Sequence, residues 1–263
     1  QMQMSLGQKV NRRCDTCGME YVPSSAEDRK LHDKYHKQNL DGFDLGKDFV
    51  AKKRRDGRKL SVFKGVKEGD AIVYLDCYDN HHRKKKGQAV LEVVQRELGA
   101  VAIPEAEIWD LKNEEINIPE SKYKSFLYIR GNKCVGYLLT QRIAAALEVL
   151  KARKQQEADA AKALEDELAE ASQHPLHLSD TRHSAVMGIS RIWTSSSHRS
   201  HGIAQCLLNT AINRHNSIRD LDDHHEEAYT RKQDVAFSQP TEAGAKLARK
   251  WFGRAYGWRV YVD

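Results

Sequence analysis

The chain alternates between short apolar runs, which favour strands, and longer segments that place apolar residues on one helical face. Val90, Leu91, Val94 and Leu98 recur at helical spacing and predict a helix over residues 88–98. The same spacing predicts helices over residues 202–215 and 241–254. Strands are predicted over residues 59–64, 71–78, 124–131, 134–142, 185–195, 234–238 and 258–262. This order predicts a mixed α/β fold with strand–helix–strand units near the C-terminus.

Two segments depart from this alternation. Residues 144–172 are rich in Ala, Glu, Lys, Leu and Gln and contain no Pro or Gly, which favours helix, but their apolar stripe is thin beyond Leu150. We therefore expect an exposed helical or partly disordered insertion at about residues 148–180. Residues 216–233 read as a polar loop that carries the acids Asp220, Asp222, Asp223, Glu226 and Glu227. Such a loop would attract a basic partner.

Composition and charge set further bounds. With 263 residues, of which 40% are hydrophobic, the chain can form one medium domain with a small appendage. No run approaches the roughly 18 apolar residues of a spanning helix, and residues 1–10 lack the apolar core of a signal peptide, so we expect no membrane association. The net charge of +6 lies mainly in residues 1–60, which hold 14 basic and 9 acidic residues. We expect a segment of residues 1–40, a basic linker of residues 41–58 and a larger domain of residues 59–263.

The basic linker contains a compact cationic run, Lys52–Arg55. This run fits a solvated loop, a phosphate contact or a nuclear-import signal. The rest of the chain is close to neutral, so the charge gives no independent case for sequence-specific DNA binding.

Cysteine and histidine spacing near the N-terminus indicates a metal site. Cys14, Cys17, His32 and His36 form the pattern C-x2-C-x14-H-x3-H. Tetrahedral zinc takes four such ligands, and two histidines four residues apart lie on one helical face. The run Ser24–Glu27 predicts the start of that helix as a capping box. Cys77, Cys134 and Cys206 lie in apolar runs and are predicted to be core residues, and the odd cysteine count favours a reducing compartment.

The predicted finger does not fit base-specific DNA reading. An isolated finger covers only about 3 base pairs. Leu31 is adjacent to His32, so the helix would not pack as in the common DNA-reading finger, and the helix mixes acidic with basic residues. A structural or protein-contact role is favoured.

A strand–loop–helix segment near residue 200 has the features of an anion site. Residues 190–194 end a predicted strand, and Arg199, Ser200, His201, Gly202, Ile203 and Ala204 lead into a helix. Small residues let backbone N–H groups approach an anion, and the helix N-terminus adds unpaired donors and its dipole. By itself this signal is weak, because strand–loop–helix turns with one glycine are common.

Motif strings strengthen this interpretation. The pattern Arg199-x-x-Gly202-x-Ala204 resembles the acetyl-CoA loop of Gcn5-related N-acetyltransferases. The wider strings 188–193 and 235–241 resemble one branch, the sister-chromatid cohesion establishment acetyltransferases, or cohesin acetyltransferases. Residues 17–24, with Asp28 and Leu31-His32, are similar to that family's single zinc finger. The resemblance does not cover the segments 148–180 and 216–233.

The resemblance implies a fold, a co-substrate and a reaction. The fold would be a Gcn5-related N-acetyltransferase fold, a mixed sheet splayed at two central strands, with a small C2H2-type zinc finger. Acetyl-CoA would enter the split between these strands. Its pantetheine arm would lie along Ile192, Trp193 and Thr194, and its pyrophosphate would bind to residues 199–204. Zinc would be structural. The acceptor would be a lysine of the cohesin ATPase head, with chromatin and replication-associated proteins as further partners, in the nucleus.

The chain departs from the family pattern where a general base is expected. Asn209 and Gln239 stand where vertebrate members carry acids, whereas Ser190 and Ser238 match. Neither amide side chain can accept the lysine proton. This implies one of two arrangements: a water relay ordered by Ser190, Ser238 and one of the two amides, or a base from elsewhere in the chain. Asp234 and Glu242 are weaker candidates.

Two other functional classes stay open. Because Asn209 and Gln239 lack acidic groups, the chain could be a zinc-finger protein that binds nucleic acid or chromatin and carries an inactive acetyltransferase-like domain. A small-molecule acetyltransferase is a third class, against which the finger and the family strings count.

Overall fold

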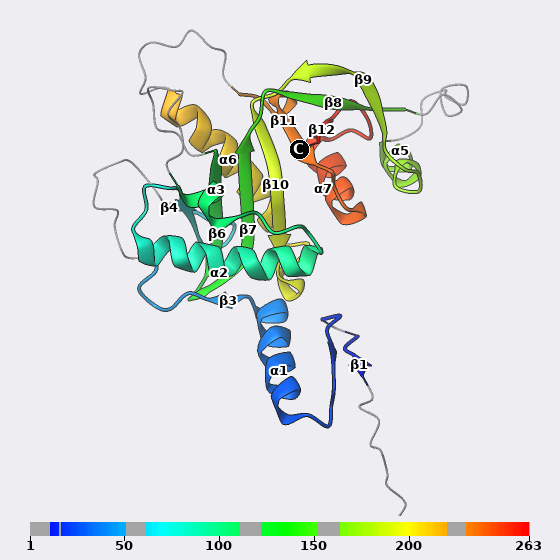
Figure 1. Cartoon of the computed structure of the whole chain (residues 1–263). Helices are drawn as coiled ribbons and strands as arrows, with labels where there is room; N and C mark the ends of the chain where they lie inside the picture. The colour runs from blue at the N-terminus through cyan, green and yellow to red at the C-terminus, as the bar shows by residue number, and fades with distance from the viewer. Residues whose placement is uncertain are drawn as a thin grey trace, which may run out of the picture.

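A computed structural model describes residues 11–15, 17–50, 62–110, 122–151, 164–219 and 230–262. The basic run Lys52–Arg55 and the acidic residues 220–227 lie outside these ranges. Figure 1 shows a finger of β1 (Arg12–Arg13), β2 (Glu20–Tyr21) and α1 (Ala26–Asp41), drawn in blue, next to a large twisted sheet with helices on both faces. None of the helices in the described ranges is long and apolar enough to cross a membrane.

The large sheet has the strand order β4-β5-β6-β7-β10-β11-β12-β8-β9. Neighbouring strands are antiparallel except β10–β11 and β11–β12, which are parallel, so the sheet is mixed. A short strand, β3 (Phe43–Asp44), joins the chain after the finger to β7. The sheet strands are β4 (Val62–Lys64), β5 (Ala71–Leu75), β6 (Tyr123–Arg130), β7 (Lys133–Arg142), β8 (Ala145–Leu150), β9 (His177–Ser184), β10 (Met187–Thr194), β11 (Val235–Ser238) and β12 (Arg259–Tyr261).

Each face of the sheet carries its own hydrophobic core. On one face, α2 (His81–Leu98) and α3 (Glu105–Trp109) bury Val90, Leu91 and Ile108. On the other face, α6 (Ile203–Arg219) and α7 (Glu242–Phe252) bury Leu207 and Trp251. Successive strand residues point to opposite faces, so strands in the middle of the sheet contribute to both cores. The mixed α/β fold is confirmed.

Residues 145–150 correct the expectation of a helical or disordered insertion. They form β8, which pairs with β12 and β9, and Val149 is buried in the core. Helix propensity is a weak preference, and tertiary pairing overrides it here. The helical expectation is met in α5 (Leu164–Ala171), between β8 and β9.

The sequence pattern also did not predict β9, α3 or the first two turns of α2. β9 is an edge strand with mostly exposed, polar residues, so it has no apolar alternation to detect. The first two turns of α2 are polar, and they are begun by Asn80, whose side chain accepts a hydrogen bond from Arg83 N at 3.0 Å. α3 spans Glu105–Trp109, too few residues to establish a helical period.

Candidate active site and zinc centre

The four predicted metal ligands come together in the finger. The ligand atoms of Cys14, Cys17, His32 and His36 all lie within 4.8 Å of one another. The cysteines occupy the turn between β1 and β2, which is closed by a 2.8 Å hydrogen bond from Gly18 N to Cys14 O. The histidines lie one turn apart on α1. Two thiolates and two imidazoles are a donor set that suits tetrahedral Zn²⁺.

The surroundings of His32 also fit a metal. Its Nε2 is buried and has no hydrogen-bond partner within the described ranges. Its Nδ1 lies 3.5 Å from Asp33 Oδ1, and a carboxylate on the second ring nitrogen is the usual support of a ligating histidine. Tyr21 stacks on the ring with centroids 4.0 Å apart. The site therefore fits structural zinc.

The helix that carries the histidines begins one residue later than the predicted capping box implies. Ser25, and not Ser24, is the N-cap, and its hydroxyl accepts a hydrogen bond from Asp28 N at 3.3 Å. The Asp28 carboxylate accepts one from Val22 N at 3.1 Å. These bonds join the helix to β2 and so fix the histidines relative to the cysteine turn.

The large sheet opens between β10 and β11. The two strands pair in parallel from Met187 opposite Val235 to Ile189 opposite Phe237, and β10 then continues to Thr194 while β11 ends at Ser238. Ser190 is an extra residue on β10, because the register with β7 shifts between Ile189 and Arg191. A bulge of this kind bends its strand and raises the local twist, which explains the divergence. We call the point where the strands separate, at Ser190 and Ser238, the fork.

Backbone groups of β10 point into this opening. Ser195 N donates to Val135 O at 3.0 Å, so residue 195 forms a hydrogen-bonded pair with β7. Such pairs alternate along an antiparallel ladder, so Trp193 bonds to β7 while Ile192 and Thr194 direct their N–H and C=O groups to the open side. Arg199 Nε donates to Thr194 O at 3.3 Å from that side. An extended ligand could pair with Ile192 as an added strand would.

The loop after β10 turns sharply into α6. Ser200 and Gly202 have left-handed backbones, with φ of 62° and 78°. A Cβ on Gly202 would meet nothing closer than Val66 Cγ2, 3.9 Å away, so the space in front of the helix is open. The first turn of α6, which begins at Ile203 and Ala204, offers its N–H groups there, and Arg199 and His201 are exposed beside it. This arrangement suits a phosphate.

His198 belongs to the same loop but is held in place. Ser195 Oγ and Ser197 Oγ each lie 2.9 Å from His198 Nδ1. Burial lowers the pKa of His198, and the charge of Arg130 lowers it further. The imidazole is therefore neutral at neutral pH, and its interactions shape the loop.

A buried carboxylate supports the turn that faces Gly202. Asp70 accepts hydrogen bonds from Arg130 Nε at 2.9 Å, Arg130 Nη2 at 2.7 Å and Tyr128 OH at 2.6 Å. Tyr128 OH in turn accepts one from Val66 N at 2.7 Å. Hydrogen bonding to Arg130 lowers the pKa of Asp70, and burial, with the Asp70 carboxylate, raises the pKa of Tyr128 to about 12. This Asp70 cluster fixes the wall beside the α6 N-terminus.

The structure brings the two predicted serines together, whereas Asn209 bonds to a different partner. Ser238 Oγ donates to Ser190 O at 3.5 Å across the fork. Asn209 lies on α6, where its Oδ1 accepts a hydrogen bond from Trp251 Nε1 of α7 at 2.9 Å. Gln239 is exposed just after β11. Asn209 thus has a packing contact of its own.

Two residues at the site were missed by sequence reasoning. Arg191 donates through Nη1 to Ser190 O at 2.8 Å and to Ser190 Oγ at 3.3 Å, which places a guanidinium at the fork. Glu97, on α2, accepts a hydrogen bond from Trp193 Nε1 at 2.6 Å. No sequence signal could have found the second contact, because the partners are 96 positions apart. Arg191 was visible within the 188–193 string, but its contact with the serine was not.

Comparisons with known proteins agree with this geometry. A family model described as the zinc-finger of acetyl-transferase ESCO matches residues 1–38, and one described as the ESCO1/2 acetyl-transferase matches residues 183–261. N-acetyltransferase eso1 of Schizosaccharomyces pombe is 29% identical over 243 residues, which cover 90% of this chain and 23% of the relative. N-acetyltransferase ECO1 of Saccharomyces cerevisiae is 26% identical over 96% of this chain and 88% of its own length. N-acetyltransferase ESCO2 of Mus musculus is 28% identical, over 90% of this chain and 33% of its own length.

A solved structure supports the fold. The xEco2 acetyltransferase domain, bound to a CoA conjugate, aligns with a TM-score of 0.51 at 21% identity, covering 78% of this chain and 98% of that one. The splayed sheet, the loop into α6 and the metal cluster thus define a zinc-finger protein with an acetyltransferase domain. More specifically, residues 1–38 are similar to the zinc-finger of the ESCO acetyl-transferases, and residues 183–261 are similar to the ESCO1/2 acetyl-transferase. It spans less than a quarter of the fission yeast relative and most of the budding yeast one.

Proposed function

We propose that the chain transfers an acetyl group from acetyl-CoA to a lysine amine of the cohesin ATPase head, and so establishes sister-chromatid cohesion. The observation that carries the proposal is the fork, where β10 leaves β11, together with the open N-terminus of α6 to which β10 leads. The names of the relatives point the same way. The nucleus follows as the expected location, and chromatin and replication-associated proteins as expected partners.

Acetyl-CoA would be held by backbone more than by side chains. Its pantetheine amides would pair with the open-side N–H and C=O groups of Ile192 and Thr194. Its pyrophosphate would lie on the loop 199–204, where α6 presents unpaired N–H groups and Arg199 supplies a charge. In this arrangement the thioester would lie near Ser190 and Ser238.

The fork supplies what the lysine needs in order to react. A free lysine amine has a pKa of about 10.4 and must lose a proton before it attacks the thioester carbonyl. The Arg191 guanidinium next to Ser190 disfavours a second cation there, which favours the neutral amine. Once the neutral amine attacks and the C–N bond forms, a water held by the two serine hydroxyls would take the second proton from the nitrogen. The water would pass that proton to the sulfur as the C–S bond breaks, so CoA leaves as the thiol.

Position 209 offers the sharpest test. Acetyl transfer to a recombinant cohesin ATPase-head fragment should be measured for the wild type and for Asn209→Glu, with Asn213→Glu as a control that adds the same charge one turn further along α6. A glutamate keeps the acceptor for Trp251 Nε1 and adds a base, so kcat should rise by about ten-fold or more in Asn209→Glu. Equal rates in all three proteins would remove position 209 from the mechanism.

A second candidate function is a zinc-finger protein that binds nucleic acid or chromatin with an inactive domain. It is favoured by the amides at 209 and 239, where acids are expected. Titration with acetyl-CoA, and in parallel with duplex DNA at near-physiological salt, separates the two functions. Failure to bind acetyl-CoA would rule out the transferase proposal.

A further inference from the structure

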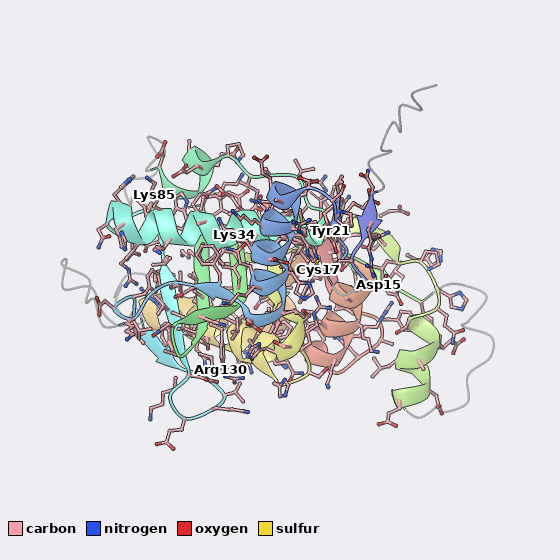
Figure 2. All side chains as sticks on the ribbon, turned by 90° about the horizontal axis from the view of Figure 1, so that it is seen from below. Asp15, Cys17, Tyr21, Lys34, Lys85 and Arg130 are labelled. Atoms are coloured by element: carbon pink, nitrogen blue, oxygen red, sulfur yellow. The ribbon has the colours of Figure 1, made fainter. Side chains whose placement is uncertain are left out.

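The finger and the sheet domain form a groove between them. It has a volume of about 750 Å³ and is lined on the finger side by Arg13, Met19, Leu31 and Tyr35, and on the α2 side by Arg96 and Gly99. Figure 2 shows the finger, with Cys17 and Asp15, lying at the end of α2 that is remote from Lys85. We call this the finger groove. One of its lining residues, Cys17, is a predicted zinc ligand, and the groove extends from the cysteine turn to the end of α2.

The walls of the finger groove are apolar and cationic. Leu31 is 57% exposed, although it lies on a helix beside the buried His32. The Arg96 guanidinium lies 5.8 Å from the ring centre of Tyr35, so a cation and an aromatic face stand together at one wall. Arg13 is exposed, and the acid in the lining, Glu97, already accepts the hydrogen bond of Trp193. The net chemistry suits a segment with an acidic and an apolar side chain.

The finger groove leads to the fork. Gly99, which lines it, is two residues from Val101, which is 85% exposed. Val101 O accepts a hydrogen bond from Arg191 Nη2 at 3.0 Å, and Arg191 Nη1 reaches Ser190. The end of α2, the residue 101 turn and the fork therefore form one continuous surface.

We propose that the finger groove receives the stretch of substrate polypeptide that flanks the acetylated lysine, with an acidic side chain against Arg13 and Arg96 and an apolar one against Leu31. The inference rests on the proposed lysine acetyltransferase function and extends it. It assigns the finger a direct part in substrate recognition. The zinc then holds one wall of the substrate site.

The test uses exposed positions, so folding is not at stake. Arg96→Glu and Leu31→Ser are compared with Lys85→Glu, on the same helix, and Val262→Ser, which is 56% exposed elsewhere. Each of the two groove variants should raise the KM for a cohesin ATPase-head fragment about ten-fold, with kcat and the KM for acetyl-CoA unchanged. The two controls should match the wild type. Unchanged KM values in both groove variants would overturn the proposal.

A binding measurement separates this proposal from the proposed function. Affinity of each variant for the same head fragment is measured by titration calorimetry without acetyl-CoA. If the wild type binds the fragment but transfers no acetyl group, the transferase proposal fails, and the groove is still supported by weaker binding of Arg96→Glu and Leu31→Ser. If these variants weaken binding of duplex DNA and leave the fragment affinity unchanged, the groove proposal is overturned.

Discussion

Replacing Asp70 by Asn should destabilise the protein and loosen the wall beside the cofactor loop. The Asp70 side chain is 4% exposed and that of Arg130 is 26% exposed. Asparagine keeps the size of the side chain but removes the charge, so the Arg130 guanidinium loses its ionic partner. The single amide oxygen must also accept the hydrogen bonds from Arg130 and Tyr128 that the two carboxylate oxygens of Asp70 accept. Breaking a buried ion pair costs about 3–5 kcal/mol, and the partial exposure of Arg130 lowers our expectation to about 2–3 kcal/mol.

The measurement is urea unfolding followed by circular dichroism, with a matched pair as control. Asp41 and Lys133 lie 3.3 Å apart with side chains 49% and 38% exposed, so Asp41→Asn should cost less than about 1 kcal/mol. A loss below about 1 kcal/mol in Asp70→Asn as well would refute the view that this pair is buried and coupled.

The pH dependence gives a second check on Asp70. Its folded pKa lies below the ordinary carboxyl value of about 3.9, so its stabilising contribution is present above that value and is lost as the pH falls through the folded pKa. The difference in unfolding free energy between wild type and Asp70→Asn should therefore shrink below about pH 4. Tyr128, with a folded pKa of about 12, contributes below about pH 10, and that contribution is lost as the pH rises toward 12.

Two further predictions concern the cofactor loop and the metal. Gly202→Ala places a side chain at φ 78°, which strains the loop by about 1 kcal/mol and should raise the KM for acetyl-CoA several-fold. The control is Gly46→Ala, which carries the same strain at φ 83° and should leave the KM for acetyl-CoA unchanged. A similar KM in both variants would contradict the role of the loop. His32→Gln should lower the zinc content measured by atomic absorption and unfold the finger, because a structural site contributes folding energy directly. Retention of stoichiometric zinc would contradict the ligand assignment.

Elements with a regular apolar period were predictable because their spacing directly reflects a buried face. Leu207 and Trp251 pack on one core and Val90 and Leu91 on the other, as the pattern requires. β8 was not predictable, because its sequence favours helix and its partner β12 lies about 110 residues further along the chain. Local preference and distant pairing conflict there, and the pairing is stronger.

The zinc site and the fork also differ in how far the sequence could predict them. The zinc ligands could be read from spacing, since a short turn and one helix bring all four together. The fork depends on Ser190 and Ser238, which lie on parallel strands 48 positions apart, and only resemblance to known strings joined them. The bulge at Ser190 and the contact from Arg191 follow from the register of β10 against β7, which no local pattern encodes.

The outer edge of the sheet has a consequence for behaviour at high concentration. β9 ends the strand order, and its residues Asp180 and Arg182 are charged and largely exposed, in a run with few apolar side chains. A free strand edge can pair with an edge of another molecule and seed aggregation. Charged side chains along that edge oppose such pairing, so the polar sequence that hid β9 from pattern analysis also keeps separate molecules from joining their sheets.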